Sequence, residues 1–122
     1  ATCLVPDPVG RYAAAAGEAQ GSVGLRAPRM EGPIAALEVP LVATSANHPG
    51  GPDPAALDDV PADLRAAVRA LDAGALPGTA SAVIDLRAVA SGGEAVLIRP
   101  GPDPEAVEQA LAAVDVRVIR PR

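Results

Sequence analysis

The sequence predicts an α/β fold in which helices pack on an open β-sheet within one domain. Three observations support this prediction. Short aliphatic segments alternate with helix-forming segments along the chain, which is the pattern of α/β proteins. Hydrophobic residues make up 49% of the 122 residues, yet Phe and Trp are absent and Tyr12 is the single Tyr. A chain of this length is typical of one domain, and its core must be built from Ala, Val, Leu and Ile.

Six short aliphatic segments are predicted to be strands, because Pro, Gly or polar residues bound each of them. They are residues 2–5, 22–27, 41–44, 81–86, 94–99 and 116–119. Pro6 stops the first segment and Pro28 stops the second. The third lies between Pro40 and a polar run, and we expect it to be a compact buried strand. A Ser-Gly-Gly turn at 91–93 connects the fourth segment to the fifth.

Four segments are predicted to be helices from their composition and spacing. They are residues 9–19, 34–38, 58–71 and 105–113. The first is rich in Ala, and Gly21 follows its end. Apolar residues recur at helical spacing toward the ends of the last two segments: Leu64, Val68 and Leu71, and then Val107, Leu111 and Val114.

Composition and charge exclude several classes of protein. The net charge is −5, and all ten basic residues are Arg, which argues against strong nonspecific binding to nucleic acid. One cysteine, Cys3, and one histidine, His48, cannot form an internal disulfide or a site with paired His ligands. No apolar run approaches the roughly 18–20 residues of a membrane span. We therefore expect a cytoplasmic domain without a membrane segment.

The best candidate for a binding site is the polar loop at 45–54, which follows the predicted strand 41–44. That strand would deliver Ser45 and Asn47 to its carboxyl end, where ligands bind in open α/β sheets. Two adjacent glycines in the loop would let the main chain approach an anion. The alternative interpretation, from composition, is an ordinary Asn/Ser turn between a strand and a helix. The Walker pattern of phosphate-binding loops is absent.

Two arginines, Arg26 and Arg99, lie at the ends of predicted strands, each just ahead of a proline. A guanidinium at a strand end can bind a carboxylate or a phosphate, although a solvated or ion-paired Arg is the alternative. Ser81 follows a Gly-containing loop and is better interpreted as a hydroxyl ligand than as a nucleophile, because no base is placed beside it. Asp85, in an apolar strand, is expected to pair with an Arg. We identify no catalytic residue and no metal-ligating cluster.

Five segments follow one another in a characteristic order. They are S-V-G-L-R-A-P (22–28), P-L-V-A-T-S-A-N-H-P-G-G-P-D-P (40–54), L-D-A-G (71–74), P-G-T-A-S-A-V-I-D-L (77–86) and V-L-I-R-P-G (96–101). Together they resemble the YrdC-like family of threonylcarbamoyl-adenylate synthases, whose pattern is V-R-x-P, S-A-N-x-S-G-x-P-S-P, L-D-G-G, E-S-T-V-V-D and I-L-R-P-G. The resemblance covers about residues 2–119. It implies a twisted, open mixed sheet with helices around a concave site.

Members of this family join L-threonine, bicarbonate and ATP into threonylcarbamoyl-AMP, which supplies the N6-threonylcarbamoyladenosine (t6A) of tRNA. The resemblance therefore implies a nucleotidyltransferase that takes ATP with Mg²⁺ and that has t6A-transfer proteins as partners. The residues it implies for ATP are Ser22, Ser45, Asn47, Asp53 and Arg99. Those it implies for L-threonine are Arg26, Ala43 and Ser81. Arg99 would face the phosphates, and Arg26 would hold the threonine carboxylate.

The sequence also departs from the family pattern. The family has an upstream threonine-containing loop and a K-x-R motif, whereas this chain contains no Lys. We therefore expect residues 1–122 to be a partial domain, truncated at its N-terminus, inactive by itself and with its first strand at an exposed edge. The P-S-P serine is Asp53 here, and the threonine of S-T-V-V-D is Ala82. The family pattern also offers an alternative for 67–71, a strand, with the preceding helix ending near Arg65.

Two other functions remain open at the level of the sequence. One is a noncatalytic YrdC-like module that binds tRNA or double-stranded RNA, against which the net charge of −5 stands. The other is a carbamoyl-transfer domain like that of hydrogenase maturation proteins. Those proteins carry zinc-finger and acylphosphatase parts that this sequence does not show.

Overall fold

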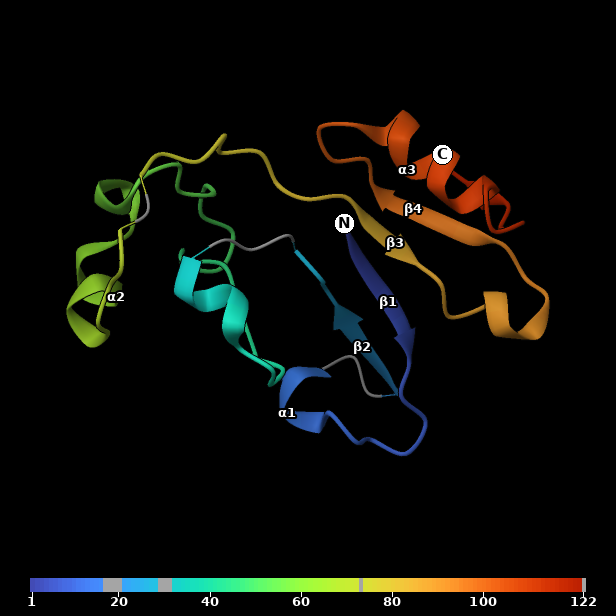
Figure 1. The fold of residues 1–122 in the computed structure, drawn as a ribbon, viewed down its shortest axis with the longest axis horizontal. Coiled ribbons are helices and arrows are strands. Elements are labelled where there is room, and N and C mark those ends of the chain that lie inside the picture. Colours follow the sequence, from blue (N-terminus) through green and yellow to red (C-terminus); the bar gives the residue numbers. More distant parts are fainter. Residues whose placement is uncertain (17–20, 29–31, 73, 122) are drawn as a thin grey trace. The chain divides into compact units, whose positions relative to one another are not determined.

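The structure is a computed structural model that describes residues 1–16, 21–28, 32–72 and 74–121 (Figure 1). The chain divides into two units. The sheet unit comprises Ala1–Val42 and Ser81–Arg122, and the loop unit comprises Ala43–Ala80. Each unit is described by itself below.

The sheet unit contains one five-stranded mixed sheet with the strand order β2-β1-β3-β4-β5. Its strands are β1 (Thr2–Pro6), β2 (Ser22–Leu25), β3 (Val83–Asp85), β4 (Ala95–Arg99) and β5 (Val118–Ile119). β1 pairs antiparallel with β2 and parallel with β3, while β4 pairs antiparallel with β3 and parallel with β5. These pairings confirm the predicted α/β fold with an open mixed sheet. The expectation that the first strand forms an exposed edge is wrong, because β1 is paired on both sides.

The helical elements are few and short. The α-helices are α1 (Ala13–Ala16), α2 (Ala62–Ala67) and α3 (Pro104–Ala112), and the 3₁₀ helices are η1 (Gly32–Ala36), η2 (Leu57–Asp59) and η3 (Val89–Ser91). Among the residues that the structure describes, no helix is long and apolar enough to cross a membrane.

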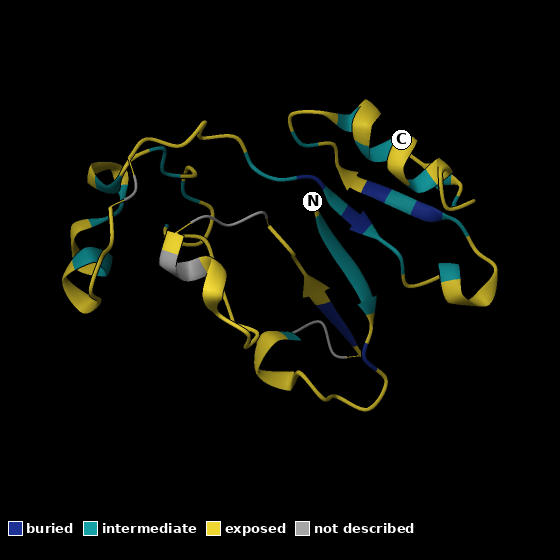
Figure 2. Ribbon diagram, viewed as in Figure 1, coloured by how far each residue is buried: buried dark blue, intermediate teal, exposed yellow. Residues whose placement is uncertain are grey.

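The core lies between the sheet and α3. Ile84, Ala95 and Leu97 are buried on the central strands, and Val107 and Leu111 of α3 pack against them. Figure 2 shows buried positions along β3 and β4, and a second buried stretch at the start of β2. The predicted aliphatic core is therefore present. Val114, which was predicted to belong to the apolar face of the helix, is largely exposed because α3 ends at Ala112.

The first helix starts later than predicted. Residues 9–12 form a turn, and the helix begins only at Ala13. Gly10 has a positive φ of 63°, which no α-helix accommodates. The buried carboxylate of Asp7 accepts hydrogen bonds from the main-chain N–H groups of Arg11 (3.0 Å) and Tyr12 (2.9 Å). The Asp7 side chain thus accepts main-chain hydrogen bonds at 11 and 12, where the first turn of a helix was predicted. Residues 17–19 of the predicted helix lie outside the described residues.

The predicted strand at 41–44 is wrong. These residues form no strand, and Leu41 and Val42 are 64% and 73% exposed. An extended segment becomes a strand only when a second strand accepts and donates its main-chain hydrogen bonds. Among the described residues, none pairs with this segment. Apolar composition alone was therefore not sufficient to place it in a sheet.

The predicted helix at 58–71 is also shorter than expected. It is divided into η2 and α2 by Val60 and Pro61, both of which have extended ψ angles. α2 ends at Ala67 because Val68 is extended, close to the end near Arg65 that the family pattern favoured. Residues 68–72 form neither the helix nor the alternative strand. Six residues are too few to hold a helix by propensity alone, so packing sets its length.

The remaining segments agree with their predictions. The strands predicted at 2–5, 22–27, 81–86, 94–99 and 116–119 are all present, with small differences in their ends. The helix predicted at 34–38 is the 3₁₀ helix η1 at Gly32–Ala36. The helix predicted at 105–113 is α3, where the Asp103 carboxylate caps the first turn by accepting from Ala106 N–H at 3.0 Å.

The turn after β3 is closed by an ion pair. The Asp85 carboxylate accepts hydrogen bonds from the Arg87 main-chain N–H (2.9 Å), from Nε (2.9 Å) and from a terminal nitrogen of its guanidinium (2.6 Å). This confirms the expected pairing of Asp85 with an Arg. The side-chain hydrogen bond from Arg87 lowers the pKa of Asp85, against a smaller opposing effect of burial.

The core predicts a contrast between two neighbouring positions on β4. Leu97 is 2% exposed and Ile98 is 49% exposed. We expect Leu97→Ala to lower the free energy of unfolding by about 2–5 kcal/mol, because it leaves a cavity beneath α3. Ile98→Ala is the matched control and should cost less than about 1 kcal/mol. Urea denaturation measures both values, and equal losses would contradict the assignment of the core to this face.

The Asp85–Arg87 pair predicts a pH dependence of stability. Because the folded protein lowers the pKa of Asp85, its carboxylate stabilises the fold above the unfolded pKa of about 3.9, and the stabilisation disappears as the pH falls through the folded pKa. We expect Asp85→Asn to destabilise the protein near pH 7, with a difference from wild type that shrinks in acid. Urea denaturation across this pH range tests it. A difference that does not change with pH would assign the effect to packing.

Candidate functional site

The register of the sheet brings three of the predicted site residues to one end. The starts of β1 and β3 and the last residues of β2 and β4 lie at the same end of the sheet. Arg26 directly follows β2, Ser81 lies just before β3, and Arg99 is the last residue of β4. We call the end that carries these three residues the arginine end.

Arg99 is oriented by the main chain of Ser81. Its Nε donates a hydrogen bond to the Ser81 carbonyl oxygen at 2.7 Å. The terminal nitrogens of the Arg99 guanidinium bond to no other described residue, and the side chain is exposed. A planar guanidinium held through Nε presents both terminal nitrogens outward as a fork, which matches the oxygens of a phosphate or a carboxylate.

No described carboxylate neutralises the positive charge at the arginine end. Neither Arg26 nor Arg99 forms an ion pair with any residue that the structure describes. In contrast, Arg87, Arg117 and Arg120 of the same unit each pair with a carboxylate. Two exposed guanidinium groups without a carboxylate partner form an arrangement that attracts an anion.

Ser22 is not part of the arginine end. It begins β2 and lies opposite Pro6, so it is at the other end of the sheet. Its side chain is buried, unlike those of Arg26 and Arg99. The predicted strand at 22–27 already separates Ser22 from Arg26, and the strand pairings add that Arg99 lies at the end of Arg26. Its contact with ATP stays a prediction.

The polar loop of the loop unit is held by Asn47. The side-chain amide of Asn47 donates to the carbonyl oxygens of Gly51 (2.8 Å) and Pro52 (3.2 Å). The carbonyl of His48 accepts from Gly51 N–H at 2.9 Å, and Gly50 has a φ of 76°, which together form a type II turn. The loop is therefore built around its own side chain, and neither helix nor strand is found in 45–54, as predicted.

The other predicted residues of the loop unit are exposed on the same stretch of chain. Ala43, Ser45 and Asp53 all lie on the surface. His48, which we interpreted as a loop residue, contacts Asp63 through its Nε2 at 3.3 Å. The structure thus places four predicted residues, Ala43 to Asp53, in the loop unit, and three others at the arginine end of the sheet unit.

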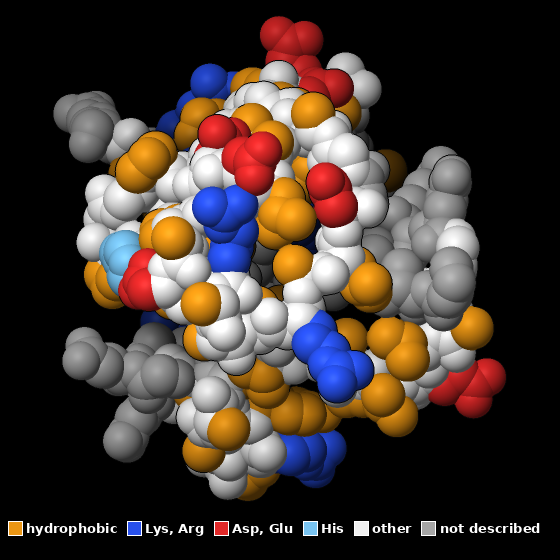
Figure 3. All heavy atoms as spheres, turned by 90° about the vertical axis from the view of Figure 1, so that its left-hand side faces the viewer, with side chains coloured by type: hydrophobic (Ala, Val, Ile, Leu, Met, Phe, Trp, Pro, Cys, Tyr) orange, Lys and Arg blue, Asp and Glu red, His pale blue; other side chains and the backbone are white. Residues whose placement is uncertain are grey.

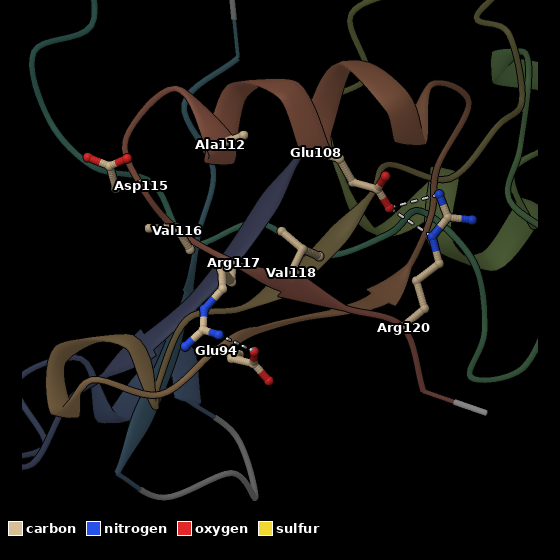
Figure 4. A pocket seen from close by; sticks show the side chains of 8 residues that line it. All are labelled: Glu94, Glu108, Ala112, Asp115, Val116, Arg117, Val118 and Arg120. Carbon is tan, nitrogen blue, oxygen red and sulfur yellow. Dashed lines mark hydrogen bonds and ion pairs between the residues drawn. The ribbon is translucent and has the colours of Figure 1, made fainter.

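Each unit also has a hollow that the sequence did not indicate. In the loop unit, a cavity of about 210 Å³ lies beside the polar loop, with Ala46, Leu57 and Leu76 among its mostly apolar lining. In the sheet unit, an open hollow of about 620 Å³ lies between α3 and β5 (Figure 4). Ion pairs from Glu108 to Arg120 (2.8 Å) and from Glu94 to Arg117 (3.7 Å) line it. Both hollows bring together residues that are distant in sequence, so no local pattern signals them.

No metal site is formed by side chains in the described part of the chain. Within it, no group of three or more His, Cys, Asp or Glu residues is placed to hold a metal ion. Mg²⁺ bound through one or two carboxylates generally takes its remaining ligands from substrate phosphates and water. The Mg²⁺ that the family resemblance implies stays a prediction.

Comparison with known protein families identifies a match over most of the chain. The model of the Sua5/YciO/YrdC family, described as "Telomere recombination", matches residues 1–101. This range contains every residue that we predicted for the binding site. No curated protein and no solved structure matches the chain significantly.

The polar loop generates a prediction about Asn47. Asn47→Asp keeps the size of the side chain but replaces a donor with a carboxylate facing two carbonyl oxygens. We expect the main-chain N–H of Gly51 to exchange with solvent at least about tenfold faster, because a hydrogen bond of ordinary net strength is lost and replaced by repulsion. Ser45→Ala is the control, since no hydrogen bond joins that side chain to a described residue. Unchanged exchange at Gly51 would show that Asn47 does not hold the loop.

Proposed function

Because the chain belongs to the Sua5/YciO/YrdC family, we propose that it is an L-threonylcarbamoyladenylate synthase-like nucleotidyltransferase. The reaction would join L-threonine, bicarbonate and ATP into threonylcarbamoyl-AMP and release pyrophosphate. Its product would supply the t6A modification of tRNA through transfer proteins. The observation that supports this proposal most directly is the pair of unneutralised arginines at the arginine end, since every substrate of the reaction is an anion or carries a carboxylate.

The chemistry requires anion binding at two points. The amino group of threonine takes up bicarbonate to give a carbamate and water. A carbamate oxygen then attacks the α-phosphorus of ATP, and the bond to the bridging oxygen of pyrophosphate breaks. Negative charge grows on the phosphate oxygens during this step, and donors that are already in place stabilise it.

The arginine end can provide these donors. In our proposal the two terminal nitrogens of Arg99 bind phosphate oxygens, while its Nε stays on the Ser81 carbonyl. Arg26 binds the carboxylate of threonine, and the Ser81 hydroxyl lies close to the amino acid. A fork already fixed by a main-chain hydrogen bond loses less side-chain freedom when the ligand arrives.

The loop unit would contribute through its polar loop. We propose that the Ser45 hydroxyl and the loop that Asn47 supports contact ATP, and that Ala43 lines the threonine pocket through its main chain. Asp53 is exposed in the same loop. A carboxylate repels phosphates but accepts hydrogen bonds from hydroxyl groups, so in our proposal Asp53 contacts the ribose of ATP.

Charge disfavours the alternative function of an RNA-binding module. The net charge is −5, and Figure 3 shows acidic as well as basic side chains among the described residues on the face that it presents. Binding to tRNA or double-stranded RNA depends on many phosphate contacts by basic residues. We therefore do not propose an RNA-binding role, and the binding experiment described next distinguishes it from the proposed function.

Calorimetric titration with ATP and with L-threonine tests the proposed function. We expect Arg99→Ala to weaken ATP binding by about tenfold or more, because a hydrogen-bonded charge is lost, with little effect on threonine. Arg26→Ala should weaken the binding of L-threonine with little effect on the binding of ATP. Arg11→Ala is the matched control: it removes the same charge from an exposed Arg that follows β1 at the opposite end of the sheet.

Two results would contradict this function. The first is the absence of heat with both ATP and L-threonine for the wild-type chain. The second is binding of tRNA that weakens steeply with salt while neither small substrate binds, which would favour the RNA-binding module. Because binding is measured, the test does not depend on turnover by these 122 residues.

A further inference from the structure

We propose that Gly101 is a positioning residue, which fixes the Arg99 guanidinium on the Ser81 carbonyl by letting the main chain lie directly against Ala82. What the guanidinium then binds rests on the proposed function. The contact itself does not, because it follows from the geometry of the sheet unit alone.

The first step is the close approach at Gly101. A Cβ atom at this position would lie 2.5 Å from the main-chain nitrogen of Ala82 and 2.9 Å from its Cα. Both atoms belong to the main chain, so no side-chain rotation can relieve the overlap. The φ of Gly101 is 68°, which also favours glycine. Any side chain at this position therefore has to push the two segments apart.

The second step is that Ala82 cannot be the segment that moves. Its carbonyl accepts a hydrogen bond from Thr2 N–H at 2.7 Å, which joins the start of β3 to β1. Ala82 is also buried, and β3 is held on its other side by β4. Displacement therefore falls on Pro100 and Gly101, and through the rigid ring of Pro100 it is passed to Arg99.

The third step is the effect on the guanidinium. Ser81, whose carbonyl holds Arg99 Nε, is the residue next to Ala82. Moving the end of β4 away from Ala82 therefore lengthens this same hydrogen bond. Without it the exposed Arg99 side chain samples many rotamers, and a ligand must order it again on binding. In the motif R-P-G, the glycine thus determines the position of the arginine side chain.

A matched control exists in the same unit. Gly92 has a φ of 81°, so alanine there meets a similar backbone strain. Nothing lies within 4 Å of a Cβ built at Gly92, whereas Gly101 meets Ala82. Comparing Gly101→Ala with Gly92→Ala therefore separates the close approach from the cost of a positive φ.

The test is the exchange of the Arg99 Nε–H with water, measured by nuclear magnetic resonance on the ¹⁵N-labelled chain. Arg99→Lys identifies the resonance by removing it. We expect a protected Nε–H in wild type and in Gly92→Ala, and exchange at least about tenfold faster in Gly101→Ala, because the bond to the carbonyl is lost. Titration of the same samples with ATP, at a temperature where each variant is folded by circular dichroism, should show weaker binding for Gly101→Ala alone.

The outcomes separate this inference from the proposed function. If the wild-type Nε–H exchanges as fast as that of a free Arg, the inference is wrong, and this result requires no variant to fold. Retained protection in Gly101→Ala would also overturn it. If protection is lost in folded Gly101→Ala but wild type binds neither ATP nor L-threonine, the positioning role is confirmed and the proposed function is rejected.

Discussion

The parallel pairing of β1 with β3 is the interaction on which the rest of the sheet unit depends. It joins the hairpin of β1 and β2 to the group formed by β3, β4 and β5. The paired strands are some 80 residues apart in the chain, so closing this contact is costly in chain entropy. Without it the arginine that follows β2 and the arginine that ends β4 would belong to two separate pieces of structure.

The same pairing explains why a main-chain carbonyl can orient a charged side chain. Thr2 binds the carbonyl of Ala82, and this holds the chain just before β3 in place. Ser81 is then a fixed acceptor for Arg99, and the glycine two residues after Arg99 packs on that same short segment. The pairing of β1 with β3 is therefore coupled to the Arg99 guanidinium through two adjacent residues, Ser81 and Ala82. Arg99 differs from Arg87 and Arg120 in the acceptor of its Nε hydrogen bond, which is an uncharged main-chain carbonyl and not a carboxylate.

The two units show different ways of holding a polar site. At the arginine end, long-range strand pairing places side chains that are distant in sequence. In the polar loop, one amide side chain bonds to carbonyls four and five residues ahead, and a Pro-Gly turn completes the structure. Local hydrogen bonds of this kind need no partner from elsewhere in the chain, so the loop could be predicted directly from Asn47 and the glycines that follow.

The sequence by itself determined the α/β class, most strands, the polar loop, the aliphatic core and the motif order of the family, since all of these depend on local composition and spacing. It was wrong for residues 41–44 and 68–71, where apolar or helix-forming residues have no partner among the described elements that would complete a strand or extend a helix. Only the tertiary structure decided that β1 is internal, that Arg99 lies at the same end of the sheet as Arg26, and that Gly101 rests on Ala82. These outcomes depend on which distant strands pair with each other. The local pattern of apolar and polar residues does not specify those partners.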